Sequence, residues 1–140
     1  MTDTLERVTA RAVLSGIEPQ LFVADVRGSC DFYTGKMGFG VAFLYGNPPF
    51  YAQVFRDNAR LNLRLVSEPV FAGDVRRREG LLSASVTLGS AAETRQLFEE
   101  YEAAGVLFHD ALKREPWGAL TFAVSDPDGN LILFAGPAED

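Results

Sequence analysis

The sequence contains a single cysteine, Cys30, among 140 residues. One cysteine excludes a disulfide framework and any zinc site built on cysteine. No apolar run approaches the roughly 20 residues that cross a bilayer, so we expect no membrane-spanning segment. The first residues include an acid and lack the apolar stretch of a secretory signal. We therefore expect a cytoplasmic protein.

Basic residues are also in the minority. Thirteen Lys and Arg stand against nineteen Asp and Glu, which gives a net charge of −6. Binding of a phosphate backbone relies on a basic surface, so we expect no nucleic-acid partner. The balance favours cationic or neutral small molecules. The one basic run, Arg76–Arg78, is followed at once by Glu79 and is typical of a solvated loop.

Apolar and aromatic residues are well represented. Hydrophobic residues make up 47% of the chain, and 11 Phe, 4 Tyr and 1 Trp are available to fill a core. A chain of this length accommodates one domain, or two small repeats that share one fold.

The order of predicted elements is the same in the two halves. Each half begins with a strand, continues with a helix that ends at a glycine (Gly38, then Gly105), and finishes with three strands. Ser90 and Glu93 form a capping-box pattern before the second helix. The predicted strands are 17–24, 41–45, 50–55 and 60–66 in the first half, and 81–88, 106–108, 119–124 and 131–134 in the second.

This repeat predicts an α+β fold made of two βαβββ modules that curl around a cleft. The parts are an N-terminal arm at 1–16, a first module at 17–66, a linker at 67–80 and a second module at 81–136. In the arm, Leu5, Val8, Ala12 and Val13 give an amphipathic pattern.

Strict alternation in 60–65 separates the two faces of one strand. Leu61, Leu63 and Leu65 share one face, and Arg60, Asn62 and Arg64 share the other. Each module therefore offers a sheet with its helix on one face and a mixed polar and aromatic surface on the other. Such a surface normally requires a covering layer or a ligand.

Four short segments occur in a distinctive order: Pro19–Asp25, Phe32-Tyr33, Gly38–Gly40 and Asp126–Phe134. In this order they resemble the vicinal oxygen chelate superfamily, which includes glyoxalase I, extradiol dioxygenases, fosfomycin-modifying enzymes and bleomycin resistance proteins. The resemblance covers residues 17–136. Its most specific piece is Asp-Pro-Asp-Gly-Asn at 126–130, a turn sequence that precedes a strand.

Enzymes of the superfamily hold one divalent metal through His, Gln or Glu side chains on four strands. The matching positions here are Glu18, Asn62 or Arg64, Ser83 and Leu133. Only Glu18 is a suitable ligand, whereas a catalytic divalent site generally needs about three. The resemblance therefore implies no metal and no other cofactor. We expect no metal-dependent lyase, epoxide-opening or dioxygenase chemistry.

The chain is most similar to the bleomycin resistance branch, which sequesters an antibiotic in clefts between two subunits. That resemblance implies a homodimer that binds and sequesters a small, cationic aromatic ligand, an antibiotic, in its cleft without a chemical step. The ligand-binding residues it suggests, together with cleft-facing neighbours, are Trp117, Phe22, Phe50, Tyr51, Glu18, Asn62, Arg64 and Ser83.

The sequence allows a second interpretation of several of these residues and of the protein as a whole. Trp117 is also suited to a dimer interface, and Phe50 and Tyr51 to sheet packing. Arg64 is suited either to an anionic ligand group or to an internal ion pair with Glu18. The whole protein is alternatively a lyase-like or dioxygenase-like enzyme of the same fold, or an interaction module.

Overall fold

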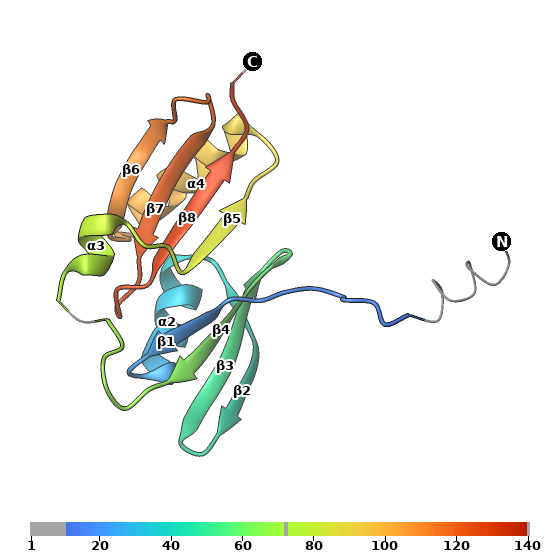
Figure 1. Ribbon diagram of the computed structural model, residues 1–140, viewed down its shortest axis with the longest axis vertical. Coiled ribbons are helices and arrows are strands. Elements are labelled where there is room, and N and C mark those ends of the chain that lie inside the picture. Colours follow the sequence, from blue (N-terminus) through green and yellow to red (C-terminus); the bar gives the residue numbers. More distant parts are fainter. Residues whose placement is uncertain (1–10, 72, 140) are drawn as a thin grey trace, which may run out of the picture.

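The computed structural model describes residues 11–71 and 73–139, and it contains two four-stranded sheets with one long helix each (Figure 1). The first module consists of β1 (Gln20–Val23), α2 (Val26–Lys36), β2 (Gly40–Gly46), β3 (Pro49–Arg56) and β4 (Ala59–Leu65). After α3 (Val75–Glu79), the second module consists of β5 (Ala84–Thr87), α4 (Ala91–Ala103), β6 (Phe108–Arg114), β7 (Leu120–Ser125) and β8 (Leu131–Gly136).

Both sheets have the same strand order. It is β1-β4-β3-β2 in the first module and β5-β8-β7-β6 in the second, and the first strand of each module pairs in parallel with the last. This repeat confirms the predicted α+β fold of two βαβββ modules. Helix α2 packs against β2, β3 and β4 on the face that carries the buried Leu63 and Val54, so the first sheet keeps a second face free of α2.

The core is one continuous cluster that draws on both modules. Leu21, Leu63 and Val54 of the first sheet are fully buried, as are Phe122 and Ile132 of the second. Cys30 is buried in the same cluster, as expected for a small apolar side chain. Burial of this aromatic and aliphatic surface is the main stabilising contribution to the fold.

Side-chain caps fix the starts of the two long helices. The Asp25 carboxylate accepts a hydrogen bond from the Gly28 backbone N–H, 3.1 Å away. The Ser90 half of the predicted capping box is confirmed, since the Ser90 hydroxyl accepts from the Glu93 N–H at 3.1 Å. The Glu93 carboxylate accepts from the Ser90 hydroxyl at 2.8 Å in place of the Ser90 backbone N–H. Each cap satisfies one of the backbone donors that a helix start leaves unpaired.

The turn at 126–130 ties the second module to the first. Asp126 is buried and accepts hydrogen bonds from the Tyr33 hydroxyl (2.9 Å) and from the N–H groups of Asp128 (2.9 Å) and Asn130 (2.8 Å). Asp128 in turn accepts from the Ala24 N–H at 2.9 Å, and the Asn130 amide donates to the Phe22 carbonyl at 3.1 Å. The turn therefore satisfies polar groups where β1 passes into α2.

The linker contradicts one sequence expectation. Arg76–Arg78 lies in the short helix α3 rather than in a solvated loop, and Arg76 turns back against the protein. Its guanidinium stacks over the Phe71 ring at 3.9 Å and donates to the Gly129 carbonyl at 3.0 Å and to the Ser83 hydroxyl. An arginine with an aromatic face, a carbonyl and a hydroxyl acceptor within reach packs there instead of extending into water.

Several predicted strand bounds were also wrong. The strand expected at 106–108 runs instead from Phe108 to Arg114, because pairing with β7 compensates for its polar sequence. The strand expected at 81–88 is confined to Ala84–Thr87.

One register shift in β2 matters for the outer face of the first sheet. Val41 is opposite Val54, but the next partner pair is Phe43 with Gln53, so Ala42 is an extra residue in the ladder. Beyond the bulge, Phe43 and Tyr45 share the face of Gln53 and Tyr51, and Leu44 shares the face of Ala52.

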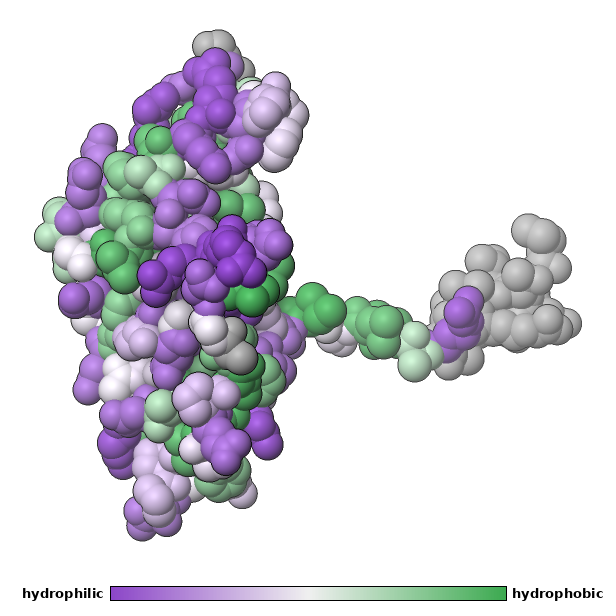
Figure 2. All heavy atoms as spheres, turned by 60° about the vertical axis from the view of Figure 1, so that its left-hand side comes forward, coloured by the Kyte–Doolittle hydropathy of each residue, from purple (hydrophilic) through white to green (hydrophobic). Residues whose placement is uncertain are grey.

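The strand predicted from residue 17 begins only at Gln20, so the described part of the N-terminal arm extends to residue 19. Residues 11–19 contain no helix or strand, and the segment extends away from the modules (Figure 1). Val13, Leu14 and Ile17 in this segment are 82%, 94% and 95% exposed, and Figure 2 shows the segment as a narrow stalk clear of the body. Leu5 and Val8 of the expected amphipathic pattern lie outside the described residues. No helix within residues 11–71 and 73–139 is long and apolar enough to span a membrane.

Candidate functional site

The outer face of the first sheet, turned away from α2, carries two cross-strand rows of side chains. Residues opposite one another on neighbouring strands share a face, so the pairing register defines each row. One row contains Phe22, Arg64, Tyr51 and Tyr45. The second contains Gln20, Asn62, Gln53 and Phe43. Arg60 and Phe55 lie opposite each other at the end beyond the second row.

Aromatic rings occupy one side of this face. Phe43 and Tyr51 lie with ring centroids 5.8 Å apart and planes tilted by 31°. Tyr45 is 64% exposed and meets Phe50 edge to face at 5.5 Å. Exposed rings held in sheet register are suited to receive a flat apolar group, because stacking on them removes apolar surface from water.

A directed hydrogen-bond network occupies the second row. The Arg60 guanidinium donates to the side-chain oxygen of Gln53 (2.9 Å), and the Gln53 amide nitrogen donates to the side-chain oxygen of Asn62 (2.8 Å). The Tyr51 hydroxyl similarly donates to the side-chain oxygen of Gln20 (3.0 Å). All three amide oxygens therefore accept from the protein. Within residues 11–71 and 73–139, the amide nitrogens of Gln20 and Asn62 donate to no protein group.

Arg64 stands exposed between two aromatic residues of the first row, Phe22 and Tyr51. The predicted internal ion pair with Glu18 does not form: among the described residues no carboxylate lies within 4.0 Å of the Arg64 guanidinium. Glu68 borders the same shallow hollow as Arg64 without pairing to it. The Arg64 fork is thus available to a ligand.

Four of the eight residues expected at the site lie together on this face: Phe22, Tyr51, Asn62 and Arg64. Phe50 is half exposed beside Tyr45 at the start of β3. Glu18 lies in the arm, just before β1, and borders a different pocket. Sequence reasoning missed Phe43, Tyr45 and Gln53, although alternation along β3 was available as a signal for Gln53. Alternation along β1 places Gln20 on the face of Phe22, but Gln20 was not among the expected site residues.

Ser83 and Trp117 lie elsewhere in the chain. The Ser83 hydroxyl is engaged by Arg76 and donates to the Asn130 side-chain oxygen at 3.2 Å. Trp117 is 74% exposed in the turn between β6 and β7. Figure 1 shows this turn at the end of the molecule opposite the β2–β3 hairpin. One copy of the chain therefore does not bring Trp117 to the first-sheet face.

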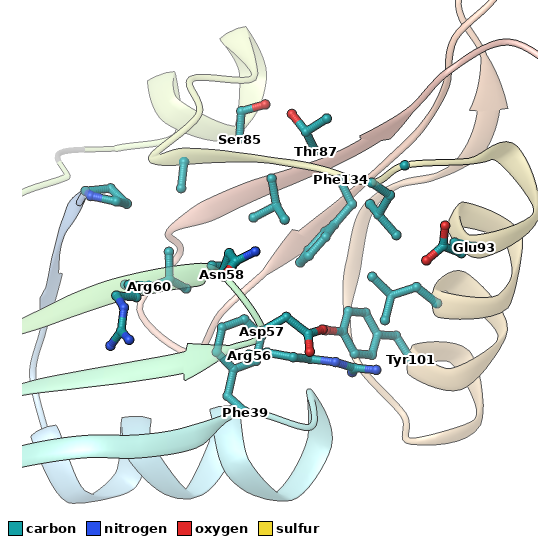
Figure 3. A pocket seen from close by; sticks show the side chains of 18 of the residues that line it. Phe39, Arg56, Asp57, Asn58, Arg60, Ser85, Thr87, Glu93, Tyr101 and Phe134 are labelled. Carbon is teal, nitrogen blue, oxygen red and sulfur yellow. The ribbon is translucent and has the colours of Figure 1, made fainter. Parts of the chain in front are cut away.

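A pocket of about 830 Å³ lies between the modules and meets the first-sheet face only at its Arg60 end (Figure 3). Phe39, Tyr101 and Phe134 contribute to its apolar lining, and the ion pair between Arg56 and Glu100 (2.6 Å) lies at its border. Strand β5 lines it with the edge that does not pair with β8. Ile17, Glu18 and Pro19 of the arm complete the lining.

The positions that correspond to metal ligands do not fit a divalent ion. The Asn62 oxygen already accepts from Gln53, the Ser83 hydroxyl is held by Arg76 and Asn130, and Leu133 has no donor atom. Within the described ranges, no three His, Cys, Asp or Glu side chains gather closely enough to share a metal.

Comparison with known proteins gives one consistent result. The family model described as Glyoxalase/Bleomycin resistance protein/Dioxygenase superfamily matches residues 16–134. A bleomycin resistance protein of Geobacillus stearothermophilus is 29% identical over 127 residues, which cover 83% of this chain and 92% of that protein.

Solved structures share the fold at lower identity. The glyoxalase/bleomycin resistance protein/dioxygenase of Alicyclobacillus acidocaldarius superposes with a TM-score of 0.69 at 19% identity, covering 91% of this chain and 94% of that one. The bleomycin-binding protein of bleomycin-producing Streptomyces verticillus, complexed with copper(II)-bleomycin, gives a TM-score of 0.65 at 22% identity and covers 93% of this chain and 100% of that one.

Proposed function

This chain belongs to the glyoxalase/bleomycin resistance protein/dioxygenase superfamily, and we propose that it binds and sequesters a small, flat aromatic molecule on the outer face of the first sheet without transforming it. The observation that carries the proposal is the row of Phe22, Arg64, Tyr51 and Tyr45 across all four strands. Flat rings with few polar groups at fixed positions are typical of ligand sites. The bleomycin resistance protein related to this chain supports a binding role.

We propose that the working form is a homodimer. Three large apolar side chains of the arm are almost fully exposed: Val13, Leu14 and Ile17. Val41 and Leu44 on the edge strand β2 are 44% and 41% exposed. Exposed apolar surface of this kind on an arm and on a sheet edge favours contact with a second copy. The free edge of β5 and the pocket beside it are suited to receive the extended arm of that copy.

A second copy also gives Trp117 a role in the site. The turn between β6 and β7 lies at one end of the folded molecule, remote from the first-sheet face of the same chain. In a symmetric dimer, each chain offers the same surfaces to the other. We propose that the turn with Trp117 closes the cleft over the first-sheet face of the partner, where its indole stacks on the ligand.

The arm is tested by making its apolar contacts unfavourable. The double variant Leu14→Asp, Ile17→Asp removes two exposed apolar groups and adds charge where burial is proposed, so the dimer should weaken by at least tenfold in its dissociation constant. Sedimentation over a range of protein concentrations measures this. Leu107→Asp, at an exposed apolar position outside the arm, is the control. A wild-type monomer at all micromolar concentrations would contradict the proposal.

The stacking site is tested with a neutral flat probe, 2-naphthamide. Tyr51→Ala removes a ring from the centre of the first row, so binding should weaken about tenfold, the order expected for one lost aromatic contact. Trp117→Ala should weaken binding similarly in the dimer, and Leu107→Ala should leave it unchanged. Calorimetric titration measures all three. Absence of binding to the wild type, or equal binding by wild type and Tyr51→Ala, would rule out the first-sheet face as the aromatic site.

A further inference from the structure

The charge on the outer face of the first sheet differs in sign from the net charge of the protein. The chain carries −6 in total, yet the charged side chains in the rows and at their end are Arg64 and Arg60. Glu18 lies beside this face, in the arm at the Arg60 end, and Glu68 lies in the loop after β4. Local charges act on a bound ligand more strongly than distant ones, because salt screens separations beyond about 8–10 Å.

The hydrogen-bond network on the face has a direction. Three amide oxygens, those of Gln20, Gln53 and Asn62, are used as acceptors within the protein. The groups left without a protein acceptor are donors: the amide nitrogens of Gln20 and Asn62 and the guanidinium of Arg64. Gln20 and Arg64 are exposed, whereas Asn62 is 8% exposed. A cationic ligand brings further donors to such a surface, whereas an anionic ligand brings acceptors.

Arg64 occupies a position suited to a planar anion. It lies between Phe22 and Tyr51 in one row, and it forms no ion pair with any described residue. A guanidinium presents parallel N–H groups that match the two oxygens of a carboxylate. The neighbouring rings lie within the reach of an aromatic group attached to that carboxylate.

We infer that the ligand of this face is an aromatic carboxylate, with its carboxylate on Arg64 and its ring system among Phe22, Tyr51 and Tyr45. The inference rests on the proposed function, because it assigns the chemical class of the molecule bound at the same site. The neighbouring amide nitrogens of Asn62 and Gln20 provide further donors to ligand oxygens. Arg60, already bonded to Gln53, orients that network and is a positioning residue.

Three probes with one ring system separate charge from stacking: 2-naphthoate, 2-naphthamide and 2-naphthylmethylammonium. Calorimetric titration of the full-length protein should rank the carboxylate tightest, about tenfold above the amide, with the ammonium weakest. Arg64→Gln should weaken 2-naphthoate about tenfold and leave 2-naphthamide within twofold. Higher salt should weaken only the binding of the carboxylate.

A matched control separates local charge from net charge. Arg77→Gln makes the same change in formal charge on the exposed side of α3 and should leave all three affinities unchanged. If no probe binds, the proposed function fails together with the inference. If the amide or the ammonium binds as tightly as the carboxylate, or Arg64→Gln weakens the dimer without changing the ranking, the aromatic site stands and the inference is overturned.

Discussion

Replacing Asp126 with alanine should lower the free energy of unfolding by about 3 kcal/mol or more. The substitution removes a buried carboxylate and deprives four donor groups of an acceptor: the Tyr33 hydroxyl, the N–H groups of Asp128 and Asn130, and the side-chain amide of Asn130. Each buried donor left without a partner costs about 1–3 kcal/mol. The loss is large because these groups sit where the second module meets the start of α2.

Chemical denaturation at one fixed protein concentration measures this loss, and thermal unfolding should show a decrease in Tm of roughly 10 °C. Asp31→Ala is a matched control, since Asp31 lies on the exposed side of α2 and its carboxylate has no partner among the described residues. A decrease below 1 kcal/mol for Asp126→Ala would show that the turn is not an important tie between the modules.

Alkaline pH should destabilise the protein steeply because two tyrosines are buried. Burial, together with the nearby Asp126 carboxylate, raises the pKa of Tyr33 well above its ordinary value of 10.0. Burial likewise raises the pKa of Tyr101 to about 12. Above pH 10 the unfolded chain releases these protons while the folded chain retains them, so stability decreases as pH rises. Each tyrosine contributes about 1.4 kcal/mol per pH unit in that window.

Denaturation curves at pH 8 and pH 11 measure the effect, and the two tyrosines together should lower stability by about 2–3 kcal/mol across that interval. The double variant Tyr33→Phe, Tyr101→Phe is less stable at pH 8, because the hydrogen bonds to Asp126 and to the Met37 carbonyl are lost. Its stability should nevertheless depend less on pH. Tyr45→Phe, which removes an exposed hydroxyl, should behave as the wild type. Parallel pH dependences in all three proteins would contradict the prediction.

The fold and half of the candidate site follow from local patterns in the sequence. Alternation along β4 separates Leu61 and Leu63, which are buried, from Arg64, which is exposed. The same reasoning places Phe22 and Leu21 on opposite faces of β1. These predictions succeed because a strand has a period of two and the helix covers one face only.

Other features depend on contacts between distant segments, which local patterns do not contain. The side chain of Arg76 is held by Phe71, Ser83 and Gly129, so its helix does not behave as the solvated loop that its charges indicate. Strand β6 is polar in sequence and owes its length to β7. The bonds from Asp128 to Ala24 and from Asn130 to Phe22 join residues more than one hundred positions apart.

The extra residue at Ala42 gives β2 a parity that its composition does not specify. If Ala42 held a regular place in the ladder, the alternation set by Val41 would place Phe43 and Tyr45 on the helix side and Leu44 on the outer face. The aromatic half of the site thus depends on the bulge in one strand. Deletion of Ala42 would join Val41 directly to Phe43 and leave both rings on the outer face, whereas loss of the bulge with Ala42 retained would exchange two rings for one aliphatic side chain. In this fold, the presence or absence of one bulge is therefore a route to altered ligand specificity that comparison of side chains alone does not detect.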